Sequence, residues 1–213
     1  MSSLRISEIF HSLQGEGVET GRPTVFVRLT GCPLRCRWCD TSYAFRGGES
    51  LTVDEICDRV AAWSTPLVTV TGGEPLAQAA APELVGALCD LGRQVSVETS
   101  GALDIGGLDP RARVVMDLKP PGSGEAHRNR YENLDRLRAQ DQVKFVIADR
   151  ADYEWSREQL NKHRLAERCE VLFSPVWERQ APAQLAQWIL DDQLPVRFQL
   201  QLHKILWGEE PGR

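Results

Sequence analysis

The chain has 213 residues, of which 42% are hydrophobic, and carries a formal net charge of -5 at pH 7. This length suits one domain, which we expect to span residues 1–213 with a core at about 7–204 and a polar tail at 208–213. Dispersed charges with a negative sum exclude nucleic acid and anionic membranes as expected partners. Because the first residues lack an apolar segment and no run of about 18 apolar residues follows, we expect a cytoplasmic protein.

Regular secondary structure is predicted along most of the chain. Runs rich in β-branched residues predict strands at 24–29, 67–71, 94–98, 113–117, 142–148, 170–173 and 196–202. Helical patterns lie at 53–60, 82–91, 131–138, 151–162 and 182–190. The first of these helices begins with Thr52 and Glu55 at the spacing of a capping box. Alternating strands and helices predict an α/β fold with a mainly parallel sheet, whose ligand lies beyond the carboxyl ends of the strands.

Three cysteines within eight residues follow the first predicted core strand, at Cys32, Cys36 and Cys39. Thiolates are the ligands that favour zinc, copper or iron-sulfur clusters. A structural zinc site takes four ligands, whereas three thiolates on a four-iron four-sulfur cluster leave one iron open for a small molecule. Because no fourth cysteine lies nearby, the spacing favours the cluster, although a non-enzymatic zinc module stays open at this point.

Further polar loops follow the next strands, so they are expected at the same edge of the sheet. A Gly72-Gly73-Glu74-Pro75 turn follows the second core strand, and residues 99–101 and 119–124 follow the third and fourth. The two glycines let the backbone approach a ligand closely, and a carboxylate suits an ammonium group. Upstream, residues 10–17 are expected to form a polar loop that precedes the first core strand.

The cysteine spacing, with the aromatic Trp38 before the last cysteine, resembles the signature of the radical S-adenosylmethionine enzymes. The resemblance implies an incomplete (β/α)6-type barrel and an iron that chelates the amino and carboxylate groups of S-adenosylmethionine. An electron from the cluster would then split the sulfonium and yield a 5'-deoxyadenosyl radical, so the cofactor supplies the difficult chemistry. The turn at 72–75 resembles the motif that contacts the methionine ammonium in that family.

A narrower resemblance covers residues from about 7 to 204. It is carried by residues 10–17, Arg28, 39–41, 98–101, 117–120 and His203-Lys204, which together are similar to the 7-carboxy-7-deazaguanine synthase family. This implies a lyase that converts 6-carboxy-5,6,7,8-tetrahydropterin to 7-carboxy-7-deazaguanine with loss of ammonia, in queuosine or other deazapurine biosynthesis. It also implies a 4Fe-4S cluster, S-adenosylmethionine, Mg²⁺, a flavodoxin or ferredoxin as electron donor, and a homodimer.

One enzymatic alternative shares the cysteine spacing. A glycyl-radical enzyme activating enzyme has a comparable length, but its substrate is a glycine of a partner protein. Residues 14–17 and 39–41 favour the deazaguanine synthase instead.

The resemblance also assigns roles to single residues. Cys32, Cys36 and Cys39 would hold the cluster, and Thr41 would offer Mg²⁺ the oxygen ligand that it prefers. Arg28 would pair with the substrate carboxylate through its planar fork. The remaining substrate contacts would come from Leu13, Gln14, Gly15, Glu16, Thr99 and His203. Contacts to S-adenosylmethionine would come from Trp38, Cys39, Asp40, Gly72, Gly73, Glu74, Gly101, Lys119, Lys144 and Ser174. No general acid or base is predicted, and whether the tail at 208–213 enters the site is left open.

Overall fold

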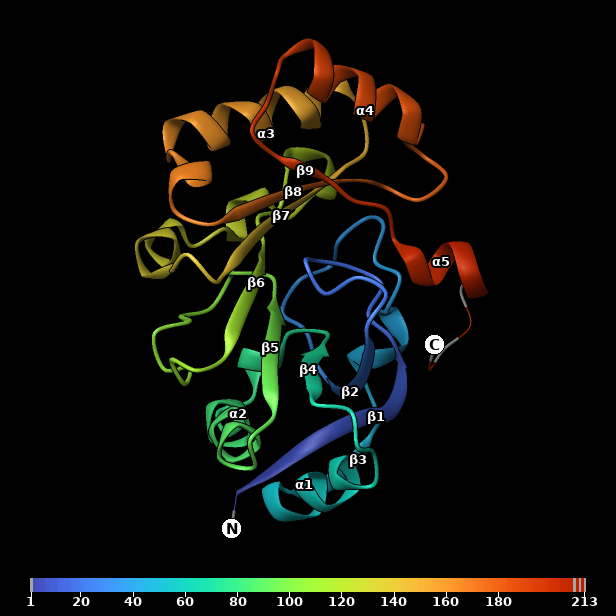
Figure 1. Cartoon of the computed structure of the whole chain (residues 1–213), viewed down its shortest axis with the longest axis vertical. Helices are drawn as coiled ribbons and strands as arrows, with labels where there is room; N and C mark the ends of the chain where they lie inside the picture. The colour runs from blue at the N-terminus through green and yellow to red at the C-terminus, as the bar shows by residue number, and fades with distance from the viewer. Residues whose placement is uncertain (1, 209, 211, 213) are drawn as a thin grey trace.

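The computed structural model describes residues 2–208, 210 and 212, which form one curved sheet with helices on its outer side (Figure 1). The sheet has nine strands in the order β3-β1-β2-β4-β5-β6-β7-β8-β9. The strands are β1 Ser3–Leu13, β2 Pro23–Leu29, β3 Glu49–Thr52, β4 Leu67–Gly72, β5 Gln94–Thr99, β6 Arg113–Asp117, β7 Gln142–Ile147, β8 Glu170–Pro175 and β9 Arg197–Phe198.

The sheet is parallel from β2 to β9, while β1 runs antiparallel to both β2 and β3. Strands β3 and β9 stand at its two edges, and no pairing joins them among the described residues. The sheet therefore stays open, which confirms the incomplete barrel implied by the resemblance. Parallel pairing places the ends of β2 and β4 to β8 on one rim, where the polar loops begin.

The helices are α1 Val53–Ala61, α2 Ala81–Asp90, α3 Arg150–Lys162, α4 Pro182–Asp191 and the short α5 Leu202–Trp207. The predicted capping box at the start of α1 is confirmed, because Thr52 N donates to Glu55 Oε2 at 2.8 Å and Glu55 N donates to Thr52 Oγ1 at 3.3 Å. No described helix is both long enough and apolar enough to cross a membrane.

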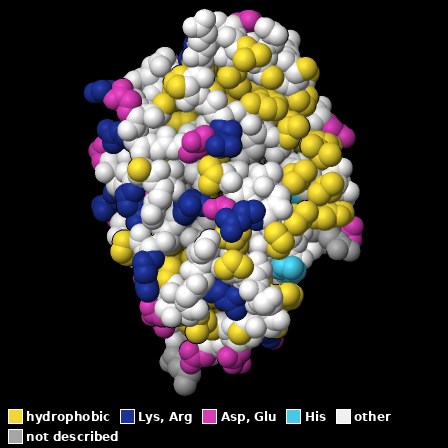
Figure 2. Space-filling model, viewed as in Figure 1, with side chains coloured by type: hydrophobic (Ala, Val, Ile, Leu, Met, Phe, Trp, Pro, Cys, Tyr) yellow, Lys and Arg dark blue, Asp and Glu magenta, His cyan; other side chains and the backbone are white. Residues whose placement is uncertain are grey.

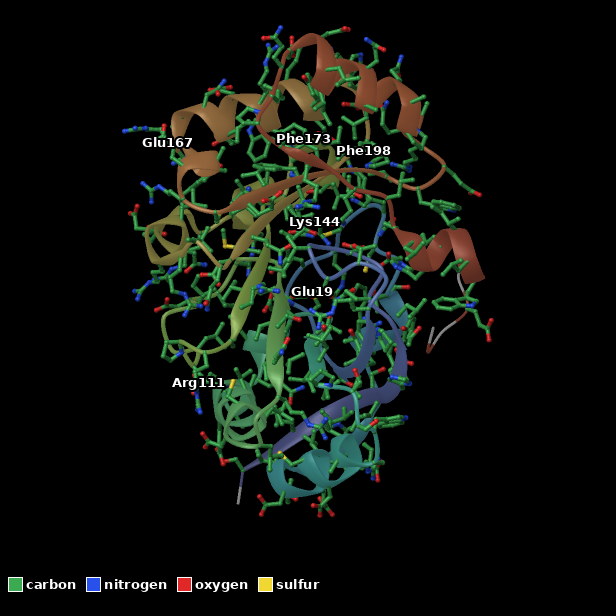
Figure 3. The ribbon with its side chains drawn as sticks, in the orientation of Figure 1. Glu19, Arg111, Lys144, Glu167, Phe173 and Phe198 are labelled. Atoms are coloured by element: carbon green, nitrogen blue, oxygen red, sulfur yellow. The ribbon has the colours of Figure 1, made fainter. Side chains whose placement is uncertain are left out.

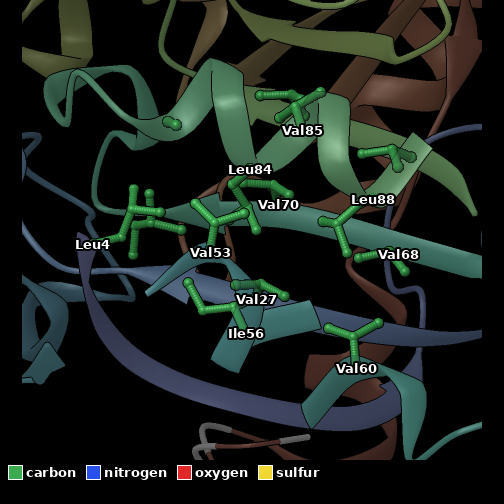
Figure 4. Packing of buried hydrophobic residues seen from close by; sticks show 14 of the residues in the cluster. Leu4, Val27, Val53, Ile56, Val60, Val68, Val70, Leu84, Val85 and Leu88 are labelled. Carbon is green, nitrogen blue, oxygen red and sulfur yellow. The ribbon is translucent and has the colours of Figure 1, made fainter. Parts of the chain in front are cut away.

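Two apolar clusters hold the helices on the sheet. In the first, Ile56 and Val60 of α1 and Leu84 of α2 pack against Val27 and Val70 of the sheet, and all five are fully buried (Figure 4). The second cluster packs α3 and α4 on the last strands and includes aromatic rings of β7, β8 and α3. Burying one such side chain contributes about 1.5–3 kcal/mol. Both halves of the sheet are therefore held firmly, which fixes the strand ends that carry the site.

The predicted core strands and four of the five predicted helices are confirmed, but the helix predicted at 131–138 is wrong. That segment is a 3-10 helix at Tyr131–Arg136. Its Asn133 is buried, and the side-chain amide donates to the carbonyls of Gly101 at 2.9 Å and Leu103 at 2.7 Å. These bonds tie the segment to a loop, so tertiary contacts override a regular α-helix.

Both ends of the chain also differ from the prediction. The polar loop predicted at 10–17 is wrong for its first four residues, which end β1. The strand predicted at 196–202 is wrong beyond Phe198. There the side chains of Gln199 and Gln201 bond to residues 16–17, and Leu202 N donates to Gly15 O at 3.0 Å as α5 begins. The apolar and polar residues alternate in that stretch because its polar side chains bond to a loop that is distant in the sequence, and not because the stretch is a strand.

Candidate active site

A cavity of about 430 Å³ opens at the carboxyl ends of the parallel strands. The polar loops that the sequence places after β2, β4, β5 and β6 all contribute to its lining, as do residues from β7 and the C-terminal segment. Most of the predicted site residues line it, namely Leu13, Gln14, Gly15, Glu16, Arg28, Cys32, Cys36, Trp38, Cys39, Asp40, Thr41, Gly72, Gly73, Thr99, Lys119, Lys144 and His203. The topology thus gathers residues that are as far apart in sequence as Leu13 and His203.

The three cysteines of the loop are free thiols that face this cavity. Neighbouring segments hold the loop through its backbone, since Arg35 N donates to Glu125 Oε1 at 2.7 Å and Arg37 N donates to Ser123 O at 3.0 Å. Burial raises the pKa of each thiol, that of Cys36 to about 11. A bound metal centre supplies the positive charge that deprotonates such thiols.

The turn after β4 lies directly beneath the cysteine loop. Glu74 N donates to Gly31 O at 2.8 Å, and a Cβ added to Gly73 would lie 2.3 Å from that same oxygen and 2.7 Å from Cys32 Cβ. Three half-buried thiols, a glycine backbone in close contact and an adjoining cavity fit a three-thiolate iron-sulfur cluster with room for a ligand at its open iron. No three His, Cys, Asp or Glu side chains within residues 2–208, 210 and 212 are arranged to hold a single metal ion.

Glu74 itself lies behind the cavity wall. It is fully buried, and its carboxylate accepts bonds from the Thr99 hydroxyl at 2.8 Å, from Ser100 N at 2.7 Å and from Leu76 N at 3.0 Å. The carboxylate thereby fixes the start of the loop after β5. Thr99 and Ser100 line the cavity, so Glu74 positions them from below in this structure.

Gln14 enters the interior of the open barrel from the loop after β1. Its side-chain amide donates to Thr69 Oγ1 at 3.1 Å and to Glu98 Oε1 at 3.3 Å, while its Oε1 accepts from Glu16 N at 3.2 Å. Glu98 also accepts from Thr71 Oγ1 at 2.9 Å. These bonds orient the Gln14 amide within the lining and leave Glu98 as a carboxylate acceptor in the cavity wall.

Glu16 and Lys144 form a buried ion pair near the centre of the molecule, where Figure 3 labels Lys144. Gln201 Nε2 donates to Glu16 Oε1 at 2.9 Å. Burial raises the pKa of Glu16, but attraction to Lys144 and His203 and bonds from Lys144 and Gln201 lower it to about 2. Glu16 is therefore an ionised acceptor over the whole neutral range.

The positive charges of this region continue towards the cysteines. Lys144 Nζ lies 3.6 Å and Lys119 Nζ lies 3.0 Å from Asp117 Oδ2. Burial lowers the pKa of Lys119, but Asp117 and Cys36 together raise it above its usual range. Asp117 Oδ1 is buried without a hydrogen-bond partner among the described residues, so it can accept a bond from a ligand.

Arg28 lies near two aromatic rings of the lining. Its Nε donates to Glu8 Oε1 at 2.6 Å, and Tyr43 donates its hydroxyl to the same oxygen at 2.7 Å. The guanidinium carbon is 5.8 Å from the centroid of the Phe10 ring and 5.9 Å from that of Tyr43. Among the described residues, only the Nε of this guanidinium has a hydrogen-bond partner. Its two terminal nitrogens can therefore bind an anion bidentately.

Thr41 and Asp40 follow the last cysteine. Thr41 Oγ1 donates to Asp40 Oδ1 at 2.8 Å, and Lys204 of α5 lies 3.4 Å from the same carboxylate. Burial raises the pKa of Asp40, whereas Lys204 and Thr41 lower it further than burial raises it. An ionised carboxylate and a hydroxyl are hard oxygen donors at one edge of the cavity.

The C-terminal segment closes one side of the cavity. His203 packs on the loop after β1, since a Cβ on Gly15 would lie 2.2 Å from its Nδ1. Gly208, Glu210 and Gly212 also line the cavity, so the described part of the tail reaches the site. Residues 209, 211 and 213 of the predicted tail lie outside the described residues.

Three predicted site residues, Glu74, Gly101 and Ser174, do not line the cavity. Sequence reasoning in turn missed Glu98 and Asp117 as single site residues, although both lie in the loop motifs that carry the resemblance. Each is a carboxylate next to buried residues near the end of a strand, which is the signal that points to them.

Comparison with known proteins agrees with this geometry. Residues 26–122 match the model of the Radical SAM superfamily. The 7-carboxy-7-deazaguanine synthases of Chlorobaculum tepidum and Koribacter versatilis are each 44% identical to the chain over 97% of its length, covering 96% and 98% of those proteins. The crystal structure of QueE from Escherichia coli superposes with a TM-score of 0.78 at 22% identity, covering 94% of this chain and 95% of that one. The chain belongs to the 7-carboxy-7-deazaguanine synthase family of radical S-adenosylmethionine enzymes.

Proposed function

We propose that the cavity binds 6-carboxy-5,6,7,8-tetrahydropterin and converts it to 7-carboxy-7-deazaguanine with loss of ammonia. The observation that carries this proposal is that the cysteine loop, Arg28 and the Gln14–Glu16 loop line one cavity. The Arg28 guanidinium, which can bind a carboxylate, and the loop at 14–16, which can bond to amide and amino groups, thus lie beside the cysteine loop. A pterin that carries a carboxylate group needs both kinds of contact. The relatives at 44% identity that are named 7-carboxy-7-deazaguanine synthase support the same reaction.

The enzyme uses a 4Fe-4S cluster and S-adenosylmethionine. When bound, this pair supplies the one-electron chemistry that starts with removal of a hydrogen atom from the substrate. Cys32, Cys36 and Cys39 hold the cluster, and the backbone of Gly72 and Gly73 borders the space beside it. The close packing of that backbone on the cysteine loop supports this arrangement.

The substrate carboxylate would pair with Arg28, whose planar fork is already oriented by its bond to Glu8 and lies near the Phe10 and Tyr43 rings. Gln14 would bond to the amide edge of the pterin through its oriented side chain. Glu16, held ionised by Lys144, would accept bonds from the amino group and ring N–H groups. Thr99 would border the ring from the end of β5, and His203 would cover it from α5.

Mg²⁺ would bind at the Thr41 hydroxyl. The ion keeps several waters and takes few protein ligands, so one hydroxyl beside an ionised Asp40 suits it. At this edge of the cavity the ion would supply positive charge that helps to orient an anionic substrate. Lys119 would contact S-adenosylmethionine from the loop after β6, while Gly101 and Ser174, which do not line the cavity, would act only through the packing behind it.

Two partners complete the proposal. One is a flavodoxin or ferredoxin that delivers the electron. The other is a second copy of the chain, and the surface proposed for it is an apolar band along α4 and α5 with the exposed residues Leu190, Ile205 and Leu206 (Figure 2). Leu206→Glu would give a monomer in analytical ultracentrifugation, and an unchanged sedimentation coefficient would reject this surface.

All six cysteines are free thiols, which supports a cytoplasmic location.

The substrate assignment is tested with anaerobically reconstituted enzyme, a reductant, S-adenosylmethionine, Mg²⁺ and the carboxytetrahydropterin. Formation of the deazaguanine, detected by mass, is the expected result. Cleavage of S-adenosylmethionine without this product would reject the proposed substrate, but the protein would still act as a radical S-adenosylmethionine enzyme. One zinc and no sulfide per chain would reject the class itself.

A further inference from the structure

A β-bulge interrupts strand β1 at Ser7. Where β1 pairs with β2, Ile6 lies opposite Leu29 and Glu8 lies opposite Arg28, so two steps along β1 match one step along β2. The extra residue is Ser7. A bulge shifts the alternation of side chains along a strand by one residue and can redirect a side chain. The two faces of β1 therefore exchange their residues at this point.

The shift divides β1 into two parts of opposite phase. Before the bulge, Leu4 and Ile6 pack in the apolar cluster that holds α1 and α2 on the sheet. After it, Ile9 packs against the same cluster, so an odd-numbered residue now faces the helices. Glu8 and Phe10 are thereby turned to the inner face, where Phe10 lines the cavity. A regular strand would place both of them on the side of the helices.

On the inner face, Glu8 stands directly opposite Arg28 in the antiparallel pair. Glu8 Oε1 accepts from Arg28 Nε at 2.6 Å, and the two side chains are 20% and 16% exposed. Arg28 lines the cavity, whereas Glu8 does not. Glu8 can therefore influence a ligand in the cavity only through the side chain that it holds.

A second donor fixes the same carboxylate oxygen. Tyr43 belongs to the 3-10 helix Ser42–Phe45, which follows the cysteine loop, and its hydroxyl donates to Glu8 Oε1 at 2.7 Å. This oxygen thus joins β2 to a segment from another part of the chain. Because two donors from separate elements hold it, the fold sets the position of the oxygen and, through it, that of the Arg28 guanidinium.

The bond to Nε determines which edge of the Arg28 guanidinium is open to a ligand. A free guanidinium can bind a carboxylate end-on, through its two terminal nitrogens, or side-on, through Nε and one terminal nitrogen. Glu8 occupies Nε, so the side-on mode is blocked. Only the end-on mode remains, and the position of a bound carboxylate is then defined.

We propose that Glu8 is a positioning residue for Arg28, which fixes the guanidinium so that its terminal nitrogens bind the substrate carboxylate end-on. This inference rests on the proposed function, since it takes a carboxylated pterin as the ligand. The bulge at Ser7 is the local feature that brings Glu8 to this place. What Glu8 contributes is the reach of its oxygen, because a negative charge beside Arg28 by itself weakens the binding of an anion.

Two substitutions separate the reach of Glu8 from its charge. Glu8→Gln keeps the length and the acceptor oxygen but removes the charge. Glu8→Asp keeps the charge but draws the oxygen back by one methylene group. The probes are 6-carboxypterin and pterin, which differ only in the carboxylate group. Equilibrium dialysis of each probe against the reconstituted enzyme with S-adenosylmethionine gives two Kd values, and their ratio measures how much the carboxylate adds to binding.

The wild type should bind 6-carboxypterin about tenfold more tightly than pterin, or tighter still, because the carboxylate gains charge-assisted bonds. In Glu8→Asp we expect this preference to fall by about fivefold or more, since Arg28 must then be immobilised by the ligand itself. The Kd for pterin should stay within about twofold of the wild-type value, because pterin has no carboxylate to orient. Glu8→Gln should keep the wild-type preference or exceed it, since the oxygen remains and the opposing charge is gone.

Glu170→Asp is the matched control. Glu170 begins β8, accepts from Arg197 Nε at 2.9 Å and does not line the cavity. The same kind of bond is therefore lost far from the ligand, and both Kd values should equal those of the wild type.

An unchanged preference in Glu8→Asp would overturn the proposal. Equal weakening of both pterins would overturn it as well, because that is the effect of a merely structural role. A preference that falls as far in Glu8→Gln as in Glu8→Asp would show that charge, and not reach, is what matters, and would also overturn it. If the wild type prefers 6-carboxypterin but forms no deazaguanine from the carboxytetrahydropterin, the proposed function fails while the role of Glu8 stands.

Discussion

Lys144 in β7 forms an ion pair with Glu16, which stands 128 positions earlier in the chain, and the two side chains are only 13% and 14% exposed. The pair fixes the loop after β1 to the opposite half of the open barrel. Burial alone would raise the pKa of Glu16, yet Lys144, His203 and Gln201 bring it to about 2. The charge on Glu16 in the cavity is therefore set chiefly by one lysine.

Replacing that lysine should make activity depend on pH. In Lys144→Met, burial of Glu16 is no longer opposed by its main counter-charge, so the pKa of Glu16 rises. The kcat/KM profile should gain an acid limb that the wild type lacks, with kcat/KM at least tenfold lower at pH 6. Lys144→Arg keeps the charge and should keep the wild-type profile. Parallel profiles for Lys144→Met and the wild type would contradict this role.

The same pair predicts how stability changes with pH. Glu16 has a lowered pKa, so its contribution is present above its ordinary value near 4.5 and is lost as pH falls towards 2. Lys144 has a raised pKa, so its contribution is present below about 10.5 and is lost only at higher pH. Between these limits, Lys144→Met should lower the free energy of unfolding by about 3–5 kcal/mol, because one partner of a buried pair remains. Denaturant unfolding at pH 7 and pH 3 measures this, and an equal loss at both values would refute it.

Arg28→Lys tests the binding of the substrate carboxylate. Lysine keeps the charge but loses the planar fork that lies near the Phe10 and Tyr43 rings. We expect KM for the carboxytetrahydropterin to rise at least tenfold, about 1.4 kcal/mol, while the KM for S-adenosylmethionine stays within twofold. Initial rates at varied concentrations of each substrate give the two values. A KM that rises for both substrates would instead indicate a general collapse of the cavity.

Thr41→Ala tests the proposed Mg²⁺ ligand. Loss of the hydroxyl should lower turnover at limiting Mg²⁺ and raise the Mg²⁺ concentration needed for half-maximal activity, while iron and sulfide contents stay unchanged. Thr41→Ser keeps the oxygen and should restore the response. Unchanged activity at limiting Mg²⁺ would exclude Thr41 as a ligand.

Local signals in the sequence are enough for much of this structure. Apolar runs predict the core strands, and the cysteine spacing predicts the cluster loop. Both features are set by residues that are close together in the sequence. The C-terminal segment could not be predicted in the same way, since Gln199 and Gln201 bond to residues 16–17 rather than to a strand. Glu74 shows a related limit: the turn is visible in the sequence, but its burial behind Thr99 depends on packing between β4 and β5.

Gly73 is the position where backbone packing and cluster assembly meet. A methyl group there would lie 2.3 Å from Gly31 O and 2.7 Å from Cys32 Cβ, so the cysteine loop must move by more than a few tenths of an ångström. Gly73→Ala should therefore lower the iron and sulfide content per chain after reconstitution and should abolish activity.

Gly107→Ala is the matched control, because Gly107 is exposed and a Cβ there meets no atom within 4 Å. It should keep the wild-type cluster content and should be as stable as the wild type or more stable by about 0.4–1 kcal/mol. Full cluster content in Gly73→Ala would show that the cysteine loop can shift without losing its ligands. The close contact between β4 and the cysteine loop would then not be what places the thiols.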